Sequence, residues 1–188
     1  MEFIKSILAD TVGIKESSIQ SLLELVTERK ISKNEFLIQE GQTCNFVGFV
    51  KEGVLRSFVY SKVEEHNNDF YFPNTIACAL TSFLTSEKTN CNIQALSDST
   101  IFCLSRQQLD SIMSQNMEWL KLSKYISDTY FIRKCKRETT FLKDQALERF
   151  KLTLELFPNI EQLVSQYHIA SYLGIKPQSL SRLKSSHR

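Results

Sequence analysis

The sequence lacks the patterns that mark membrane spans, metal sites and common catalytic centres. No apolar run among its 188 residues approaches the roughly 18 residues that cross a bilayer, and residues 1–10 lack the apolar core of a cleavable signal. The three histidines, His66, His168 and His187, form no nucleophile or metal motif, and no glycine-rich phosphate loop precedes a helix. These absences predict a soluble, cytoplasmic protein that binds no metal and is not an enzyme.

The cysteines form no Cys-x-x-Cys pair and have no histidine cluster near them. They are Cys44, Cys78, Cys91, Cys103 and Cys135. Widely scattered cysteines in a cytoplasmic chain favour free, buried thiols over disulfides or metal ligands.

The net charge of +2 conceals an uneven distribution along the chain. Residues 1–112 contain 10 Lys and Arg against 14 Asp and Glu, whereas residues 113–188 contain 13 against 7. A basic surface for a polyanionic partner is therefore expected in the C-terminal part. The length allows one full core and part of a second, hence one or two domains.

The N-terminal half changes its hydrophobic pattern at Ile31. Apolar residues recur at helical spacing over residues 3–30, with a break at Val12 and Gly13. Short apolar runs then alternate with turn residues, which is typical of an antiparallel roll of about seven strands. The runs are 36–38, 46–50, 54–60, 70–72, 92–96 and 100–104, and the turns are 40–41, 52–53, 66–68 and 97–99.

The chain becomes helical after the roll. Ser105 and Gln108 form the pattern of a capping box, which opens a helix to about Gln115. Residues 116–142 give a longer helix with apolar positions among lysines, arginines and glutamates. Two alternatives stay open for its apolar residues: packing within one chain, or the seam of a dimer.

Residues 166–184 have the spacing of a helix-turn-helix of roughly twenty residues. The positions that agree include Ile169, Ala170, Leu173, Gly174, Ile175, Leu180 and Leu183. Ala170 must be small because the second helix crosses close to it, and Gly174 permits the positive φ that ends the first helix. Pro177 is suited to the first position of the second helix.

The remaining polar residues of this unit are of the types that bind DNA. Gln178, Ser179 and Arg182 on the second helix can read base edges, with Lys176 and Lys184 beside them for phosphates. Ser165, Gln166 and Tyr167, at the start of the first helix, are placed to contact phosphate. The alternative is an ordinary helical hairpin with a solvated polar face. The agreement at seven positions favours DNA binding, and His168 is interpreted as a surface or phosphate-contacting residue.

The order of roll, long helix and terminal helix-turn-helix resembles the Crp/Fnr family of bacterial transcription regulators over nearly the whole chain. The stretch FLIQEGQTCNFVGFVKEGVLRSFV at residues 36–59 is similar to the first strands of the cyclic-nucleotide-binding roll. The stretch IASYLGIKPQSLSRLK at residues 169–184 is similar to the DNA-reading end. The resemblance implies a homodimer through the long helix, and so favours the dimer seam.

The resemblance also locates a phosphate cassette and shows that it is altered. Nucleotide-binding members of the family have a Gly-Glu pair, whose Glu holds the ribose, and an Arg-Ser or Arg-Thr pair about ten residues later, whose Arg neutralises the cyclic phosphate. Aligning Phe83 and Ala95 with the family places residues 78–79, Cys-Ala, at the first pair and residues 89–90, Thr-Asn, at the second. With neither the carboxylate nor the cation, cyclic AMP is not expected to bind in the usual way.

The altered cassette leaves two alternatives for the pocket: a neutral or weakly polar effector, or a pocket that has lost its ligand. The candidate effector residues are Ala79, Thr81, Ser82, Thr89 and Asn90. Other family sensors lack support here, since the first cysteine lies within the strand region and His66 lies in a polar, turn-like run. No cofactor is predicted, and the sequence does not identify the effector.

The sequence as a whole predicts an α+β protein in three parts. These are a cyclic-nucleotide-binding-like antiparallel β-roll over residues 1–115, a connecting and dimerisation helix over residues 116–143, and an all-α helix-turn-helix domain over residues 144–188. Too few residues follow Lys184 for a full β-hairpin wing, and His187 and Arg188 extend the basic end. The predicted function is a dimeric, sequence-specific regulator that binds double-stranded DNA, with RNA polymerase and a small-molecule effector as candidate partners and no membrane partner. The alternative is an effector-binding module that acts through protein contacts.

Overall fold

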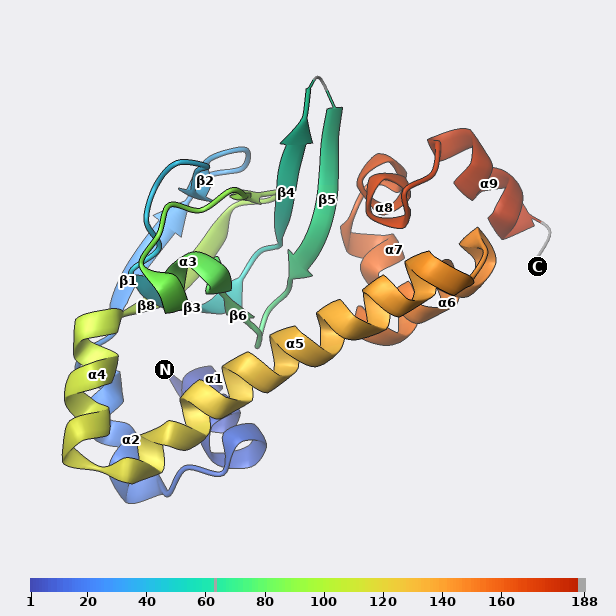
Figure 1. The fold of residues 1–188 in the computed structure, drawn as a ribbon. Coiled ribbons are helices and arrows are strands. Elements are labelled where there is room, and N and C mark those ends of the chain that lie inside the picture. The colour runs from blue at the N-terminus through green and yellow to red at the C-terminus, as the bar shows by residue number, and fades with distance from the viewer. Residues whose placement is uncertain (63, 186–188) are drawn as a thin grey trace.

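The computed structural model describes residues 1–62 and 64–185, and its strands form a roll of two four-stranded antiparallel sheets (Figure 1). The strands are β1 (Thr27–Ile31), β2 (Phe36–Ile38), β3 (Phe46–Glu52), β4 (Leu55–Ser61), β5 (Glu64–Tyr71), β6 (Ile76–Ala77), β7 (Asn92–Ala95) and β8 (Ser99–Ser105). One sheet has the order β1-β8-β3-β6 and the other β2-β7-β4-β5. The predicted α+β class with an antiparallel roll is confirmed.

Helices precede and follow the roll. They are α1 (Glu2–Ser6), a π-helical turn (Ile7–Val12), α2 (Glu16–Leu23), α3 (Leu80–Thr85), α4 (Arg106–Gln115), a 3-10 turn (Met117–Trp119), α5 (Leu120–Lys143), α6 (Ala146–Leu156), α7 (Ile160–Leu163), α8 (Gln166–Leu173) and α9 (Pro177–Ser185). Helix α5 is the long diagonal of Figure 1, which runs from the N-terminal helices past the roll to the C-terminal ones. The capping box of α4 is present, since Ser105 and the Gln108 side chain bond each other's backbone N–H groups.

The main hydrophobic core joins the roll to α1, α2 and one face of α5. Trp119, Leu122 and Ile126, at the start of the long helix, are buried in it, and Tyr130 follows one turn later. Their spacing of three to four residues places them on one stripe of the helix. The same helix therefore packs within its own chain on one face and remains open to solvent on the opposite face.

The predicted helix over residues 3–30 is wrong at its C-terminal end. Thr27–Ile31 form strand β1, which pairs antiparallel with β8 so that Thr27 faces Cys103 and Ile31 faces Ser99. The apolar helical spacing ends at Leu25 and Val26, and the segment Thr-Glu-Arg-Lys-Ile has no helical stripe of its own. Pairing with a distant strand decides its conformation, as is common for short segments.

The predicted turn at residues 66–68 is also wrong, because these residues lie within β5. Strand β5 pairs with β4 from Ser61–Glu64 to Leu55–Tyr71, with one register shift beside Ser57. A run of acids and asparagines is unusual in a strand, since such residues disfavour it. Here their polar groups find partners outside the sheet, as described for the contact with α8.

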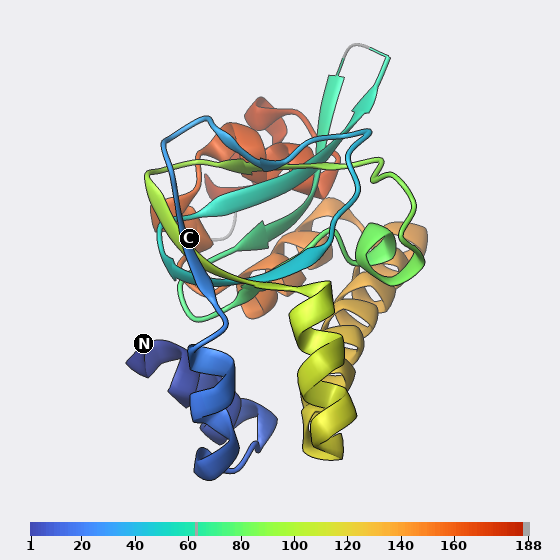
Figure 2. The same ribbon diagram turned by 90° about the vertical axis from the view of Figure 1, so that its left-hand side faces the viewer.

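A second hydrophobic core joins the C-terminal helices to the roll. Phe70 of β5 packs against Phe157 and Tyr172, with ring centroids 5.7 and 5.5 Å away. Val54, at the start of β4, belongs to the same core, together with the fully buried Leu180 of α9. The C-terminal helices therefore rest on the β4–β5 side of their own roll (Figures 1 and 2).

Candidate nucleic-acid interface and effector cavity

Helices α8 and α9 form a tight pair around Gly174. Gly174 has a φ of 67° at the C-terminal end of α8, and Ile175 N–H donates to the Ala170 carbonyl 3.0 Å away. Ala170 and Leu180 have no exposed surface, as expected where two helices cross. A Cβ at Gly174 would also lie 3.1 Å from the Phe141 ring. The turn therefore needs glycine for its backbone conformation and for space.

The predicted DNA-contacting residues lie on the surface of this helical pair. Those that are exposed are Ser165, Gln166, Tyr167, Lys176, Gln178, Ser179 and Arg182. Lys184 is partly buried and forms an ion pair with Glu161. Gln166 and Lys184 line one hollow between the start of α8 and one face of α9, so both helices contribute to one surface. His187 and Arg188 lie outside the described residues.

His168 is not the surface residue that the sequence analysis expects, because it faces the roll. Its Nδ1 lies 3.3 Å from Nη1 of Arg56, a residue only 4% exposed. Arg56 also forms an ion pair with Glu65 at 2.6 Å and hydrogen bonds to Gln94 Oε1. His168 is thus part of a polar junction between α8 and the β4–β5 hairpin.

Three further hydrogen bonds connect α8 to β5. The Asn67 N–H donates to Ser171 Oγ at 3.0 Å, and Ser171 Oγ donates to the Glu65 carbonyl at 2.9 Å. Asn67 Nδ2 donates to the His168 carbonyl at 3.1 Å. Since β5 is the end strand of its sheet, α8 covers an edge that would otherwise expose backbone groups. This α8–β5 junction fixes the orientation of the helical pair on the roll.

The junction predicts a stability that depends on pH. Burial first, and then the Arg56 charge, lower the pKa of His168 to about 4, against the opposing effect of Glu65. The unfolded chain therefore binds a proton at a higher pH than the folded chain does. We expect the unfolding free energy to fall as the pH drops from about 6.5 to about 4, by less than about 1.4 kcal/mol per pH unit because solvent screens the half-buried imidazole. Urea unfolding at several pH values measures this loss.

His168→Gln is the matched variant for this experiment, because a glutamine can accept from Arg56 without titrating. The difference in unfolding free energy between the wild type and His168→Gln should change between about pH 6.5 and about pH 4. Parallel pH dependences in the wild type and the variant would show that His168 does not titrate abnormally.

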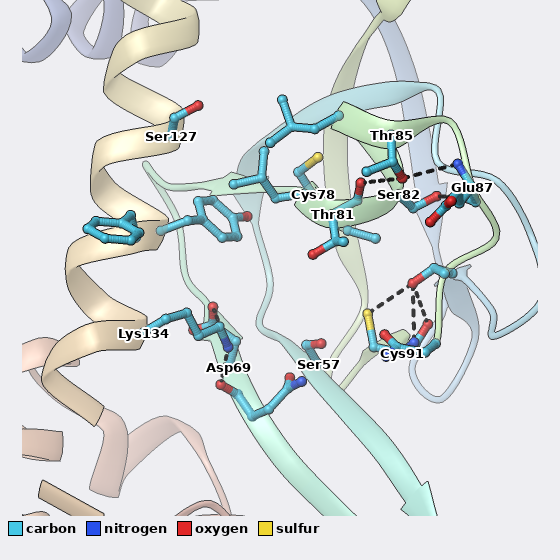
Figure 3. Close-up of a pocket in the computed structure, with 18 of the residues that line it drawn as sticks. Ser57, Asp69, Cys78, Thr81, Ser82, Thr85, Glu87, Cys91, Ser127 and Lys134 are labelled. Atoms are coloured by element: carbon cyan, nitrogen blue, oxygen red, sulfur yellow. Dashed lines mark hydrogen bonds and ion pairs between the residues drawn. The ribbon is translucent and has the colours of Figure 1, made fainter. Parts of the chain in front are cut away.

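A cavity of about 530 Å³ lies between the roll and α5 (Figure 3). It is open to solvent on one side and is lined by β4, β5, α3, the loop that follows α3, and the middle of α5. The structure brings all five candidate effector residues to its wall: Ala79, Thr81, Ser82, Thr89 and Asn90. Residues 78–79 and 89–90, which align with the two pairs of the phosphate cassette, thus line one cavity.

Two of the candidate hydroxyls are already used by the protein. Ser82 Oγ accepts from the Cys44 N–H at 2.9 Å and donates to the Glu87 carbonyl. Thr89 Oγ1 bonds to the backbone of Cys91 and lies 3.2 Å from its Sγ. Both hydroxyls shape the cavity wall, whereas Thr81 and Asn90 are exposed.

The cavity also contains charged residues that no motif in the sequence indicates. Asp69 of β5 lines it, is 1% exposed and pairs with Arg133 of α5 at 2.8 Å. Lys134 also lines the cavity and lies 3.8 Å from the Asp69 carboxylate. A turn predicted at residues 66–68 gives Asp69 no defined position. In the strand that the structure shows, the Asp69 side chain points toward α5.

Membrane-spanning helices and metal-binding clusters are both absent from the described residues 1–62 and 64–185. No helix among them is long and apolar enough to cross a membrane. They also contain no cluster of three or more His, Cys, Asp or Glu side chains that could hold a metal ion.

The structure thus combines an antiparallel roll, a cavity between the roll and α5, and a pair of C-terminal helices packed on the roll. Residues 28–116 match the family model described as the cyclic nucleotide-binding domain. No curated protein matches the sequence. The family match covers the roll up to the start of the long helix.

Solved structures extend the likeness to most of the chain. A CooA mutant from Carboxydothermus hydrogenoformans is 20% identical, with a TM-score of 0.70 over 88% of this chain and 77% of that one. FixK2 from Bradyrhizobium japonicum is 18% identical, with a TM-score of 0.73 over 86% and 83%. A Eubacterium rectale protein assigned to the crp/fnr family of transcriptional regulators is 15% identical, with a TM-score of 0.68 over 94% and 83%. The resemblance to the Crp/Fnr family is confirmed, and the chain has a Crp/Fnr-type fold.

Proposed function

We propose that the protein is a dimeric, cytoplasmic transcription regulator that binds specific DNA sequences through α8 and α9. The observation that carries the proposal is the division of α9 into two faces. Leu180 is fully buried, while Gln178, Ser179 and Arg182 are exposed on the other side. These side chains can pair with base edges in a major groove, since Arg matches guanine and Gln matches adenine.

The surroundings of α9 suit a duplex. The exposed start of α8, with Gln166 beside the hollow, can contact phosphate through its backbone N–H groups and side chains. The surplus of basic residues over residues 113–188 adds non-specific attraction. Two copies related by a two-fold axis would place their α9 helices about 34 Å apart, and so would read an approximately palindromic site.

The second copy is proposed to pack on the exposed face of α5. Phe131 is 70% exposed and Leu142 82% exposed, and Cys135 is exposed one turn after Phe131. All five cysteines are free, as the sequence predicts; the predicted burial is confirmed for Cys44, Cys78 and Cys103, is partial for Cys91 and is wrong for Cys135. Cys135 and Leu142 share a stripe opposite Ile126 and Tyr130, which pack on the protein's own roll, and Phe131 lies at the edge of this stripe, where it also lines the cavity. A parallel pair of α5 helices would cover this stripe.

Oxidative cross-linking at Cys135 tests this seam. If two α5 helices pair about a two-fold axis, their Cys135 side chains lie near each other, and mild oxidation should give a covalent dimer. The control is Asp110→Cys in a Cys135→Ser background, which moves the exposed thiol to α4, away from the seam. The cross-linked fraction on a non-reducing gel should be high for the wild type and low for the control. Equal, slow cross-linking of both would contradict the seam.

The cavity supports an effector other than cyclic AMP bound in the usual way. Its charged lining residues balance, with Asp69 and Glu87 against Lys88 and Lys134. The Asn68 amide oxygen in its wall is buried and accepts no hydrogen bond. A neutral or zwitterionic ligand with a hydrogen-bond donor suits this lining better than a phosphate diester does.

Strand β5 connects this cavity to the DNA-binding helices. Asp69 and Tyr71 line the cavity, while Glu65 and Asn67 of the same strand bond to α8. A ligand that shifts β5 would therefore act directly on the α8–β5 junction. We propose this strand as the route by which an effector changes DNA affinity.

The salt dependence of duplex affinity separates this function from the alternative of a module that acts through protein contacts. A DNA-binding protein that neutralises several phosphates should lose affinity steeply as salt rises, with a slope of about −0.9 per phosphate contacted. Fluorescence anisotropy with a random duplex at several salt concentrations measures the slope. Weak association that does not change with salt would favour the protein-contact module.

A further inference from the structure

Two buried thiols lie side by side at the wall of the cavity. Cys44 precedes β3 and Cys78 follows β6, and the antiparallel pairing of these strands, with Gly48 facing Ala77, brings them together. Both Sγ atoms donate to one acceptor, the Phe46 carbonyl oxygen, at 3.3 Å from Cys44 and 3.5 Å from Cys78. Cys78 also lines the cavity, where Figure 3 shows its side chain.

We propose that Cys44 and Cys78 form a reversible dithiol–disulfide pair that is oxidised by hydrogen peroxide entering through the cavity. Two sulfurs that bond to one oxygen are at most about 7 Å apart, so rotation of the side chains with a small backbone shift can join them. Peroxide is small enough for the cavity, and Cys78 is the sulfur that it meets there.

The surroundings of the two thiols shift their pKa values in opposite directions. The hydrogen bond from Cys78 is the largest influence on Cys44 and lowers its pKa to about 7, although burial acts in the opposite direction. The same hydrogen bond and burial raise the pKa of Cys78. Cys103 is buried without such a partner, and its pKa is raised to about 11. Near neutral pH, part of Cys44 is therefore ionised, and this thiolate gives up its own hydrogen bond to the Phe46 carbonyl and accepts one from Cys78.

The oxidation proceeds in two steps that balance. The Cys78 sulfur attacks one peroxide oxygen, its proton passes to the Cys44 thiolate, the O–O bond breaks and hydroxide leaves. The Cys44 sulfur then attacks the sulfenic acid on Cys78, so that the S–S bond forms, the S–O bond breaks and water leaves with the Cys44 proton. Two electrons pass from the sulfurs to peroxide, and a thiol reductant reverses the change.

A bond between these cysteines would alter the cavity. Cys78 is followed by Ala79, the N-cap of α3, and the Cys44 N–H donates to Ser82 within α3. The bond would tie the start of β3 to the start of α3, whose residues form one wall of the cavity. This proposal concerns the roll alone and does not depend on DNA binding.

Peptide mapping tests the pair directly. The full chain carrying Cys135→Ser, which removes the exposed thiol, is treated at pH 7 with up to about a tenfold molar excess of hydrogen peroxide, alkylated and digested. We expect mass spectrometry to find the Cys44 and Cys78 peptides linked, and separated again by dithiothreitol. The rate should rise with pH through the pKa of Cys44, which is about 7, and level off about one pH unit above it, where Cys44 is largely deprotonated. Recovery of both cysteines as alkylated thiols, or their separate oxidation without a link, would overturn the proposal.

Single cysteine variants test whether Cys44 and Cys78 are the residues that form the disulfide. Cys44→Ala and Cys78→Ala should each abolish the link, whereas Cys91→Ser, at the other cysteine of the cavity, and Cys103→Ala should keep it. Circular dichroism establishes that each variant is folded. The mapping on the Cys135→Ser chain decides the proposal even if a core variant fails to fold, because that chain retains both cysteines.

Discussion

Replacing Asp69 with alanine is expected to lower the unfolding free energy by about 3–5 kcal/mol, the cost of removing one partner of a buried ion pair. The Asp69 side chain is 2% exposed and its partner Arg133 is 14% exposed, so the variant leaves a guanidinium charge in a largely dry position. Arg133 also lies over the rings of Tyr130 and Phe157, which hold it in place. Because these rings surround it, the Arg133 side chain cannot easily turn to solvent. Urea unfolding followed by circular dichroism measures the loss.

The matched control is Glu155→Ala, which removes the acid of an exposed ion pair between α6 and α5. Glu155 pairs with Lys136, and the two side chains are 67% and 48% exposed. Its loss should change stability by less than about 1 kcal/mol, as for most surface pairs. Similar effects of the two variants would mean that the Asp69–Arg133 pair does not join β5 to α5 as described.

Arg182→Ala should lower affinity for the preferred DNA site by about 1–3 kcal/mol, and should relax the preference at one base pair of each half-site. The exposed guanidinium of Arg182 is the group on α9 that can form two hydrogen bonds to a guanine edge. The loss is expected to be much smaller on unrelated sequences, since a base contact contributes little there. Affinities for the preferred site and for single-base variants measure both effects.

Lys176→Ala is the control for charge, because Lys176 is exposed at the turn between α8 and α9. Its removal should weaken binding to all sequences alike and should flatten the salt dependence by about one unit. Lys184 is a poorer control, since it is already paired with Glu161. Equal losses from Arg182→Ala and Lys176→Ala on every sequence would contradict a base contact by Arg182.

The local geometry of the α8–α9 pair could be predicted because single residues impose it. Glycine at position 174 adopts a φ of 67° without strain and leaves room for the Phe141 ring, and Pro177 begins a helix where its missing N–H has no cost. The capping box of Ser105 and Gln108 is equally local. Such signals lie within a few residues of one another, so one sequence is enough to find them.

The contact between α8 and β5 could not be predicted, because its partners lie about one hundred residues apart in the chain. Glu65 and Asn67 have the composition of a turn, and only Ser171 and His168, at the far end of the sequence, satisfy them within a strand. His168 likewise shows no sign in the sequence that Arg56 will bury it. In β5 and at His168 of α8, contacts with distant parts of the chain determine the structure, and the local sequence preference does not.

The cavity was predicted in position but not in chemistry. The candidate residues Thr81 and Asn90 lie in its wall. The sequence does not show that the Ser82 and Thr89 hydroxyls bond to the protein's own backbone, nor that Asp69 and Lys134 come from β5 and α5. Hydrogen bonds within a loop depend on its backbone path, which residue identity alone does not determine.

Selection of the purified protein against a randomised duplex pool, with Arg182→Ala alongside, is the most direct test that α8 and α9 read DNA as a symmetric pair. The account predicts that the wild type enriches a two-fold symmetric motif with half-sites about one helical turn apart, and that the variant loses the preference at one base pair of each half-site. An asymmetric motif, or the same motif from both proteins, would contradict the assignment of Arg182 and the dimer. Failure to enrich any sequence, at low and at high salt, would contradict sequence-specific DNA binding itself.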